Sequence, residues 1–168
     1  MPPFNQVYAL NGAMTSGVDL LHGLARMLGM ETLDIPGVTD DQHNDYAAQA
    51  VGALQALEEY DLVVIHIEAP HEAAHAGAID DKIEALQRVD SEVLSRIRSW
   101  RPDNLRTLIL PDHPTPIKTQ THSGEPVPFM LWGPRFTTNG AKRFTEAEAK
   151  NTGFFIEEGY KIMGRLIG

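Results

Sequence analysis

The sequence contains no cysteine, so disulfide bonds are excluded and any transition-metal site must use histidine, aspartate or glutamate. No apolar run approaches the roughly 20 residues of a membrane-spanning helix, and the amino terminus lacks the charged and apolar regions of a secretion signal. The 14 basic residues are dispersed among 23 acidic ones, without the basic stripe that binds a phosphate backbone. We therefore expect a cytoplasmic protein that binds neither membrane nor nucleic acid.

Three motifs of common enzyme folds are also missing. The sequence has no Gly-x-Gly-x-x-Gly after a strand, no Gly-x-x-x-x-Gly-Lys-Ser/Thr and no Gly-x-Ser-x-Gly. Nucleotide-binding folds and α/β-hydrolases are thereby disfavoured. The composition itself, with 42% hydrophobic and 22% charged residues in 168, is that of a folded globular protein, and it predicts a single domain over residues 1–168.

Helix and strand signals alternate along the chain and predict an α/β fold. Apolar residues at helical spacing predict helices at 18–28 (capped by Thr15 or Ser16), 46–57 (capped by Asn44), 81–100 and 154–166. Short apolar runs predict strands at 31–35, 62–67, 105–110 and 127–132, the second with the pattern of a strand buried on both faces. Such an alternation predicts βαβ crossovers and a three-layer αβα architecture with a mostly parallel sheet.

Side chains that can bind a metal ion follow two of these predicted strands. His71 and His75 come after the strand at 62–67, whereas Asp112, His113 and His122 come after the next one. A right-handed crossover would make the two strands parallel, so both loops would leave the same edge of the sheet. Imidazole and carboxylate groups suit a divalent cation, and a four-residue spacing puts two rings on one helical face. The five residues therefore predict a divalent-metal site.

Histidines and buried-face acids also occur in proteins for structural reasons alone. A lone loop histidine is usually exposed and inert, and the His71-x-x-x-His75 spacing taken alone is a weak signal. His66 is expected to be a hydrogen-bonded core histidine, and His22 and His43 to be surface residues. Asp90 falls within the apolar stripe of the helix at 81–100, so it either bonds loop amides or lies at the margin of that stripe. The members of that stripe are Ile83, Leu86, Val93 and Ile97.

Several of these motifs, taken in order, resemble the archaeal-type cofactor-independent phosphoglycerate mutases of the alkaline phosphatase superfamily. The resemblance is carried by residues 61–77, 112–116, 121–123, 126–129 and 152–159, together with Lys82 and Asp90. It implies an alkaline-phosphatase-like fold, two divalent cations and transfer of a phosphoryl group through a phosphoserine, which interconverts 2- and 3-phosphoglycerate. By this resemblance, residue 71, His75 and His122 would hold one ion, and Asp112 and His113 the other.

The sequence departs from the family pattern at two points. His71 stands where relatives have aspartate, and a site of three imidazoles favours zinc, cobalt or nickel over magnesium, with manganese also to be considered. In the family, a preceding part of the chain supplies an aspartate, the nucleophilic serine and a cap that binds the phosphorylated small-molecule substrate. We expect that amino-terminal part of the fold to be lacking here, since no serine matches the nucleophile motif among Ser16, Ser91, Ser95, Ser99 and Ser123.

Three functional hypotheses remain open at this stage. In the first, the chain is the carboxyl-terminal metal-binding part of a phosphoglycerate mutase and is inactive alone. In the second, it is a related metal-dependent phosphotransferase or phosphatase, such as a homoserine kinase. In the third, it is a non-catalytic metal-binding module. A sheet without its amino-terminal strands would expose an unpaired edge, which proteins usually cover by pairing. We therefore also expect a homo-oligomer, or assembly with a complementing amino-terminal half.

Overall fold

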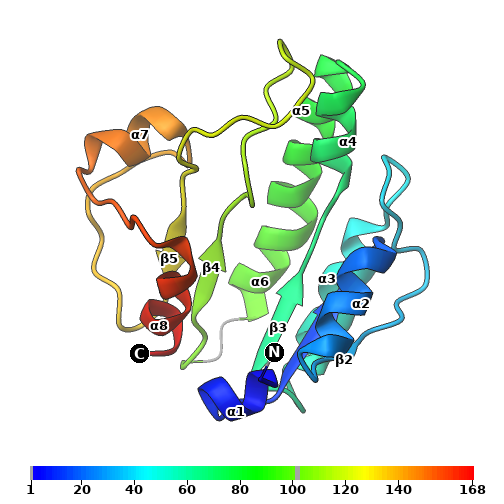
Figure 1. The fold of residues 1–168 in the computed structure, drawn as a ribbon, viewed down its shortest axis with the longest axis vertical. Helices are drawn as coiled ribbons and strands as arrows, with labels where there is room; N and C mark the ends of the chain where they lie inside the picture. The colour runs from blue at the N-terminus through cyan, green and yellow to red at the C-terminus, as the bar shows by residue number, and fades with distance from the viewer. Residues whose placement is uncertain (1, 101–102) are drawn as a thin grey trace. The chain divides into compact units, whose positions relative to one another are not determined.

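The computed structural model describes residues 2–100 and 103–168, which fold as two compact units (Figure 1). The first unit runs up to Trp100 and also takes in Ile117–Thr121; the second holds the other residues to Pro116 and His122–Gly168. The elements of the first unit are α1 (Phe4–Tyr8), β1 (Gly12–Thr15), α2 (Asp19–Met27), β2 (Glu31–Thr32), α3 (Tyr46–Ala56), β3 (Leu62–Ile65), α4 (Ala69–His75), α5 (Ile79–Arg88), the π-helical segment η1 (Val89–Leu94) and α6 (Ser95–Trp100). Those of the second are β4 (Thr107–Ile109), β5 (Met130–Trp132), α7 (Glu146–Asn151), the 3-10 segment η2 (Gly159–Lys161) and α8 (Ile162–Ile167).

A parallel sheet of three strands, in the order β2-β1-β3, organises the first unit. The chain passes from β1 to β2 through α2 and then back across the sheet to β3 through α3. Because parallel crossovers are right-handed, these opposite steps place α2 and α3 on opposite faces, and Figure 1 shows α2 in front of α3. The four residues of β3 are each half-buried, so the prediction of a strand fully buried on both faces is not met within this unit.

The central strand β1 was not expected from the sequence. Gly12, Ala13 and Met14 have little intrinsic preference for strands, and the run is only four residues long. Pairing on both edges, with β2 and with β3, overrides that weak preference. Its carboxyl end delivers Ser16, which is almost fully buried, to the edge of the sheet where β3 ends.

Two helix boundaries can be compared with their predicted signals. The helix predicted at 18–28 is confirmed as α2, and the chain turns directly after it at Gly29, whose φ of 69° favours glycine. The cap of α3 is Asp45, whose side chain accepts the Ala48 N–H at 2.9 Å. The predicted cap, Asn44, was wrong by one residue: its side chain instead accepts the Thr39 N–H at 3.0 Å.

The long helix predicted at 81–100 is interrupted by the π-helical segment η1. A π turn inserts extra backbone and rotates all later side chains around the axis, so a stripe counted at 3.6 residues per turn loses its register. Val93 of the predicted stripe is buried, but Ile83 and Leu86 are about half exposed, at 49% and 52%. Asp90 is exposed, which agrees with the alternative that it lies at the margin of the stripe. The buried cluster of this region is Tyr46, Ala50, Ala69, Ala85 and Val93.

The second unit differs from the expected pattern of parallel strands. Strand β4 pairs antiparallel with β5, and within the described residues neither strand bonds to the three-stranded sheet. The loop of about 20 residues between them allows this return, which needs no crossover helix. The helix predicted at 154–166 is confirmed only at its end, as η2 and α8, because Gly153 has a φ of 67° and starts an irregular segment. Among all the residues described, no helix combines the length and apolarity needed to cross a membrane.

Candidate metal site

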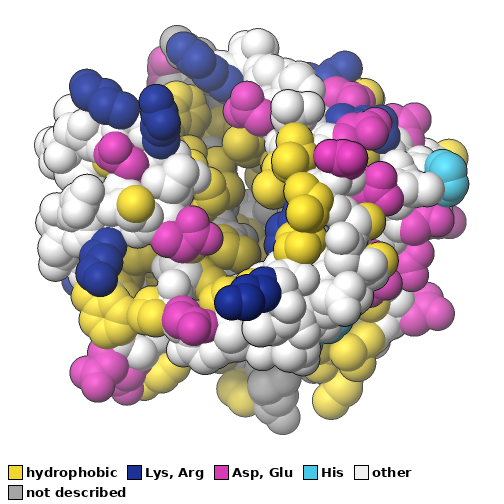
Figure 2. Space-filling model, turned by 90° about the horizontal axis from the view of Figure 1, so that it is seen from above, with side chains coloured by type: hydrophobic (Ala, Val, Ile, Leu, Met, Phe, Trp, Pro, Cys, Tyr) yellow, Lys and Arg dark blue, Asp and Glu magenta, His cyan; other side chains and the backbone are white. Residues whose placement is uncertain are grey.

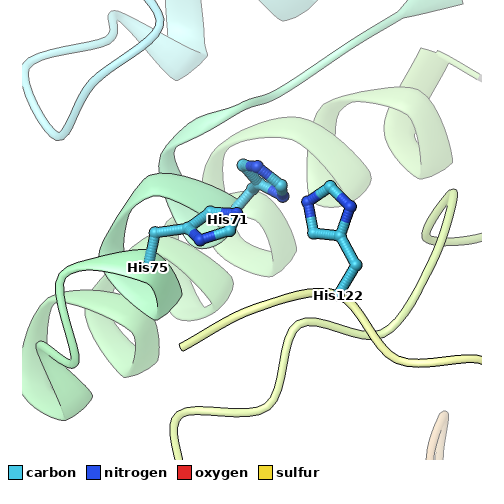
Figure 3. Close-up of side chains that lie close together, drawn as sticks. All are labelled: His71, His75 and His122. Atoms are coloured by element: carbon cyan, nitrogen blue, oxygen red, sulfur yellow. The ribbon is translucent and has the colours of Figure 1, made fainter. Parts of the chain in front are cut away.

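Helix α4 carries His71 and His75 on one face, four residues apart. The helix begins directly after β3 with Pro70 in its first turn, where the missing N–H of proline is not needed. Ala69 and Ala74 of the same helix are buried in the core, at 3% and 0% exposure. The two imidazole rings therefore project together, with centroids 4.4 Å apart and an edge-to-face arrangement (Figure 3). The predicted pairing of these two histidines is confirmed.

The loop Ile117–Thr121 of the same unit determines which ring nitrogen of His75 carries the proton. The Nδ1 atom of His75 lies 2.9 Å from the backbone oxygen of Gln120, and a carbonyl oxygen can only accept a hydrogen bond. Nδ1 must therefore carry the proton in the neutral ring, and Nε2 is left with its lone pair. A histidine that donates one ring N–H to a carbonyl is oriented for metal binding through the other nitrogen.

Gly77 and Gln120 hold this loop against the end of α4. A Cβ atom on Gly77 would lie only 2.1 Å from the side-chain nitrogen of Gln120, and the φ of Gly77 is 70°. Gln120 itself adopts a φ of 52°, which is uncommon outside glycine. Strained backbone of this kind is found at sites where the surroundings demand a given geometry. Here it presents the carbonyl of Gln120 to His75.

A chain of polar side chains lies beneath α4 in the first unit. The hydroxyl oxygen of Ser16 is 3.0 Å from Nδ1 of His66, and Nε2 of His66 is 3.1 Å from Glu68. The other carboxylate oxygen of Glu68 is 3.7 Å from Nε2 of His71. His66 is thus hydrogen-bonded as expected of a core histidine, although it is only half-buried. Glu68 was not predicted as part of the site. Its position two residues after His66 and three before His71 could have indicated contact with both histidines.

The remaining predicted ligands lie together in the second unit. The Asp112 carboxylate accepts the backbone N–H of His113 at 2.9 Å and lies 3.2 Å from Nε2 of its ring. The ring of His113 stacks on that of His122, with centroids 3.8 Å apart. A backbone bond from Ser123 to Pro114 closes the loop between them. Asp112 and His122 are exposed, whereas His113 is half-buried.

The five predicted residues thus form two groups, one in each unit. From the sequence, we expected a strand at 105–110, parallel to β3, to bring both groups to one edge of the sheet. The strand forms as β4, but it pairs antiparallel with β5. Along the chain, Gln120, which is bonded to His75, lies two residues before His122. Imidazoles of set tautomer with nearby carboxylates are a donor set that fits a divalent transition metal. A further group of possible donors in the first unit, Glu68, His71 and Glu72, has ligand atoms within 4.8 Å of one another.

Comparison with known proteins identifies the family to which this arrangement corresponds. Residues 1–161 match the family described as the Metalloenzyme superfamily. The chain belongs to the Metalloenzyme superfamily. This membership, with the three parallel strands and their helices, confirms the alkaline-phosphatase-like α/β fold.

Curated relatives support the resemblance found in the sequence. The chain is 40% identical to a 2,3-bisphosphoglycerate-independent phosphoglycerate mutase of Methanothrix thermoacetophila, over 99% of this chain and 43% of that protein. It is 38% identical to phosphoglycerate mutase 2 of the same type from Methanothermobacter thermautotrophicus, over 97% of this chain and 41% of that protein. The chain therefore spans about two fifths of the length of these relatives.

Two solved structures share the fold. The PH0037 protein from Pyrococcus horikoshii is similar with a TM-score of 0.93 and 28% identity, over 99% of this chain and 50% of that one. A cofactor-independent phosphoglycerate mutase from Thermoplasma acidophilum is similar in fold, with a TM-score of 0.64 and 22% identity, over 99% of this chain and 38% of that one.

Proposed function

We propose that this chain is the carboxyl-terminal, metal-binding part of a cofactor-independent phosphoglycerate mutase. The observation that carries the proposal is the pair His71 and His75 on α4, with the tautomer of His75 set by the Gln120 carbonyl. The identities of 38–40% with proteins named as such mutases supply the activity. The complete reaction, which interconverts 2- and 3-phosphoglycerate, would need the three fifths of the relatives that this chain does not span.

The five histidine and aspartate residues would divide between two ions. His71 and His75, with His122, would hold the first; Asp112 and His113 would contribute to the second. When bound, such ions polarise a phosphoryl group and lower the pKa of a hydroxyl nucleophile. A site with three imidazoles and no anionic ligand favours zinc or cobalt, with manganese and magnesium bound more weakly.

The roles of the chain's own residues are to bind and to orient. His75 is held by the Gln120 carbonyl, and the Asp112 carboxylate receives a bond from the His113 backbone, so both groups are fixed before a ligand arrives. The nucleophilic serine and the residues that bind the phosphorylated substrate are proposed to come from the remaining part of the family fold. The isolated chain is accordingly expected to bind metal and to be inactive as a mutase.

A second candidate is a metal-binding module without catalysis. The observation in its favour is His71, a neutral ligand where the resembling mutases have aspartate, because the transferring phosphoryl group would be less well neutralised. A related metal-dependent phosphotransferase, such as a homoserine kinase, would use the same residues of this chain, and only the part that binds substrate would distinguish it.

The proposal can be tested first by metal binding. Purified chain, titrated with zinc in competition with a chromophoric chelator, should bind zinc, and His75→Ala should weaken binding at least about tenfold because a ligand is lost. His43→Ala, at an exposed histidine elsewhere in the first unit, is the matched control and should bind as the wild type does. Zinc binding that is equal in all three proteins would contradict the proposed site.

The mutase activity requires a second experiment. The chain is mixed with the separately expressed amino-terminal part of the Methanothrix thermoacetophila mutase, and conversion of 3-phosphoglycerate is assayed with zinc or manganese. Activity that needs both parts and is lost in His75→Ala supports the first candidate. Stoichiometric metal binding without conversion of 3-phosphoglycerate favours the module, and transfer to another acceptor favours the phosphotransferase.

A further inference from the structure

We infer that Glu68, held in place by His66 and Ser16, is a positioning residue that orients His71 for metal binding. The inference rests on the proposed metal site and adds the groups that determine how tightly His71 binds. All four residues belong to the first unit, so their distances are set within one compact body.

The direction of every proton in this chain of residues follows from chemistry. The carboxylate of Glu68 can only accept, so the His66 Nε2 that lies 3.1 Å away must carry a proton. Nδ1 of the neutral His66 ring is then an acceptor, and the Ser16 hydroxyl 3.0 Å away donates to it. The Ser16 oxygen in turn accepts the backbone N–H of Val18 at 3.0 Å. The hydrogen bonds therefore run in one direction, from Val18 to Glu68.

The backbone of His66 is anchored independently. Its N–H donates to the Thr15 carbonyl at 2.9 Å, and its carbonyl accepts the side-chain amide of Gln49, also at 2.9 Å. Gln49 is fully buried, and it also accepts a bond from the Asn44 amide at 2.9 Å. Strand β1 and helix α3 thus hold His66 from two sides. An imidazole fixed in this way can aim its Nε2–H at one carboxylate oxygen of Glu68 and leave the other oxygen for a second partner.

The second partner is His71. Its Nε2 lies 3.7 Å from the other carboxylate oxygen of Glu68, three residues earlier in the chain, and the side chains are only 23% and 19% exposed. A carboxylate at this distance favours the tautomer of His71 with the proton on Nε2, which leaves the lone pair on Nδ1 for the ion. His75 achieves the same end with the Gln120 carbonyl. Each ligand of α4 would then have its own acceptor, the arrangement in which metal-binding histidines are usually found.

The affinity of the full chain for zinc tests this inference. Loss of such an outer partner typically weakens binding about 10–100-fold, so Glu68→Gln and Ser16→Ala should both bind zinc less tightly than the wild type. Because Ser16 acts through Glu68, Ser16→Ala should add no further loss in a Glu68→Gln background. Glu59→Gln is the matched control: this acid is exposed in the first unit, and it has no place in the chain of bonds from Ser16. An equal loss in Glu59→Gln would overturn the inference.

The tautomers give a readout independent of affinity. Long-range ¹H–¹⁵N spectra of the metal-free wild type should show the proton of His66 and of His71 on Nε2, and zinc should shift Nδ1 of His71. A proton on Nδ1 of His71, or zinc bound through Nε2, would overturn the inference even if every variant failed to fold. Absence of zinc binding by the wild type would instead contradict the proposed function, while the metal-free spectra would still decide the role of Glu68.

Discussion

At the scale of single residues, the identity of residue 71 is expected to set the metal preference of the site. An imidazole suits borderline metals, whereas a carboxylate adds a negative charge and a hard oxygen that manganese and magnesium prefer. His71→Asp should therefore bind manganese more tightly relative to zinc than the wild type does. Competition titrations with both metals measure this ratio. An unchanged ratio would show that His71 does not contact the ion; His43→Asp, at an exposed position, controls for the added charge.

A second residue-scale prediction concerns stability away from the site. Tyr46 is completely buried, its ring lies 4.3 Å below the Arg88 guanidinium, and within the described residues its hydroxyl has no hydrogen-bond partner. Because a buried hydroxyl without a partner is unfavourable, Tyr46→Phe should raise the free energy of unfolding by about 1 kcal/mol at pH 7. Urea denaturation followed by circular dichroism measures the change. A lower unfolding free energy in the variant would contradict this account.

The same substitution should alter the response to alkaline pH. Burial raises the pKa of Tyr46 above its ordinary value of 10.0, so the folded state holds this proton more tightly than the unfolded chain does. Its contribution is complete below pH 10 and is lost as pH rises from 10 towards the folded pKa. The stability gap between Tyr46→Phe and the wild type should therefore widen above pH 10.

Site residues that lie at a regular local interval could be predicted from the sequence. Site residues that are far apart in the sequence and meet only in the folded structure could not. The four-residue interval between His71 and His75 predicts a shared helical face, and the structure confirms it. The contact between Ser16 and His66 joins positions 50 residues apart, and it depends on β1, which local propensity did not predict. Only strand pairing reveals such a contact.

At the scale of elements, the packing of the loop Ile117–Thr121 against α4 is expected to control metal affinity. Gly77→Ala would place a Cβ atom against the end of the Gln120 side chain, which must turn away, and would strain a φ of 70° at the end of α4. The packing of Gln120 on α4, which aligns its carbonyl with His75, would be lost. We expect weaker zinc binding although no ligand is changed.

Gly124→Ala is the control for this substitution. Gly124 follows the same loop, and apart from its chain neighbours no atom of the described residues lies within 4 Å of the position of its Cβ. Zinc titration of both variants, with thermal unfolding to confirm folding, separates the two. Equal affinities in Gly77→Ala and the wild type would mean that the loop does not support His75.

The helices and strands were predictable where one pattern dominated a segment. Helix α2 has regular apolar spacing and a glycine stop, and both signals agree. The helix at 81–100 kept its predicted extent but lost its predicted face, because the π turn at Val89–Leu94 is not encoded by spacing. Strands β4 and β5 were predicted, but their antiparallel pairing depends on contacts that no local pattern records.

At the scale of the whole molecule, exposed apolar surface and open strand edges predict association. Leu20, Leu24 and Met27 line one face of α2 at 70%, 38% and 67% exposure, and β2 and β3 each pair only with β1 among the described residues. Figure 2 shows hydrophobic side chains open to solvent between acidic ones on the face that it draws. Such features are usually covered by pairing. Sedimentation velocity should show a dimer or larger species, and a monodisperse monomer would contradict this prediction.

The central proposal is that His71 and His75 of α4 bind a divalent metal ion. X-ray absorption at the zinc edge of the chain loaded with one equivalent of zinc tests it most directly, because nitrogen ligands of imidazole give a characteristic scattering pattern. We predict an inner shell rich in imidazole nitrogen at about 2.0 Å, which loses one imidazole in His75→Ala and is unchanged in His43→Ala. A shell of oxygen ligands only, or a spectrum that His75→Ala leaves unaltered, would contradict the account.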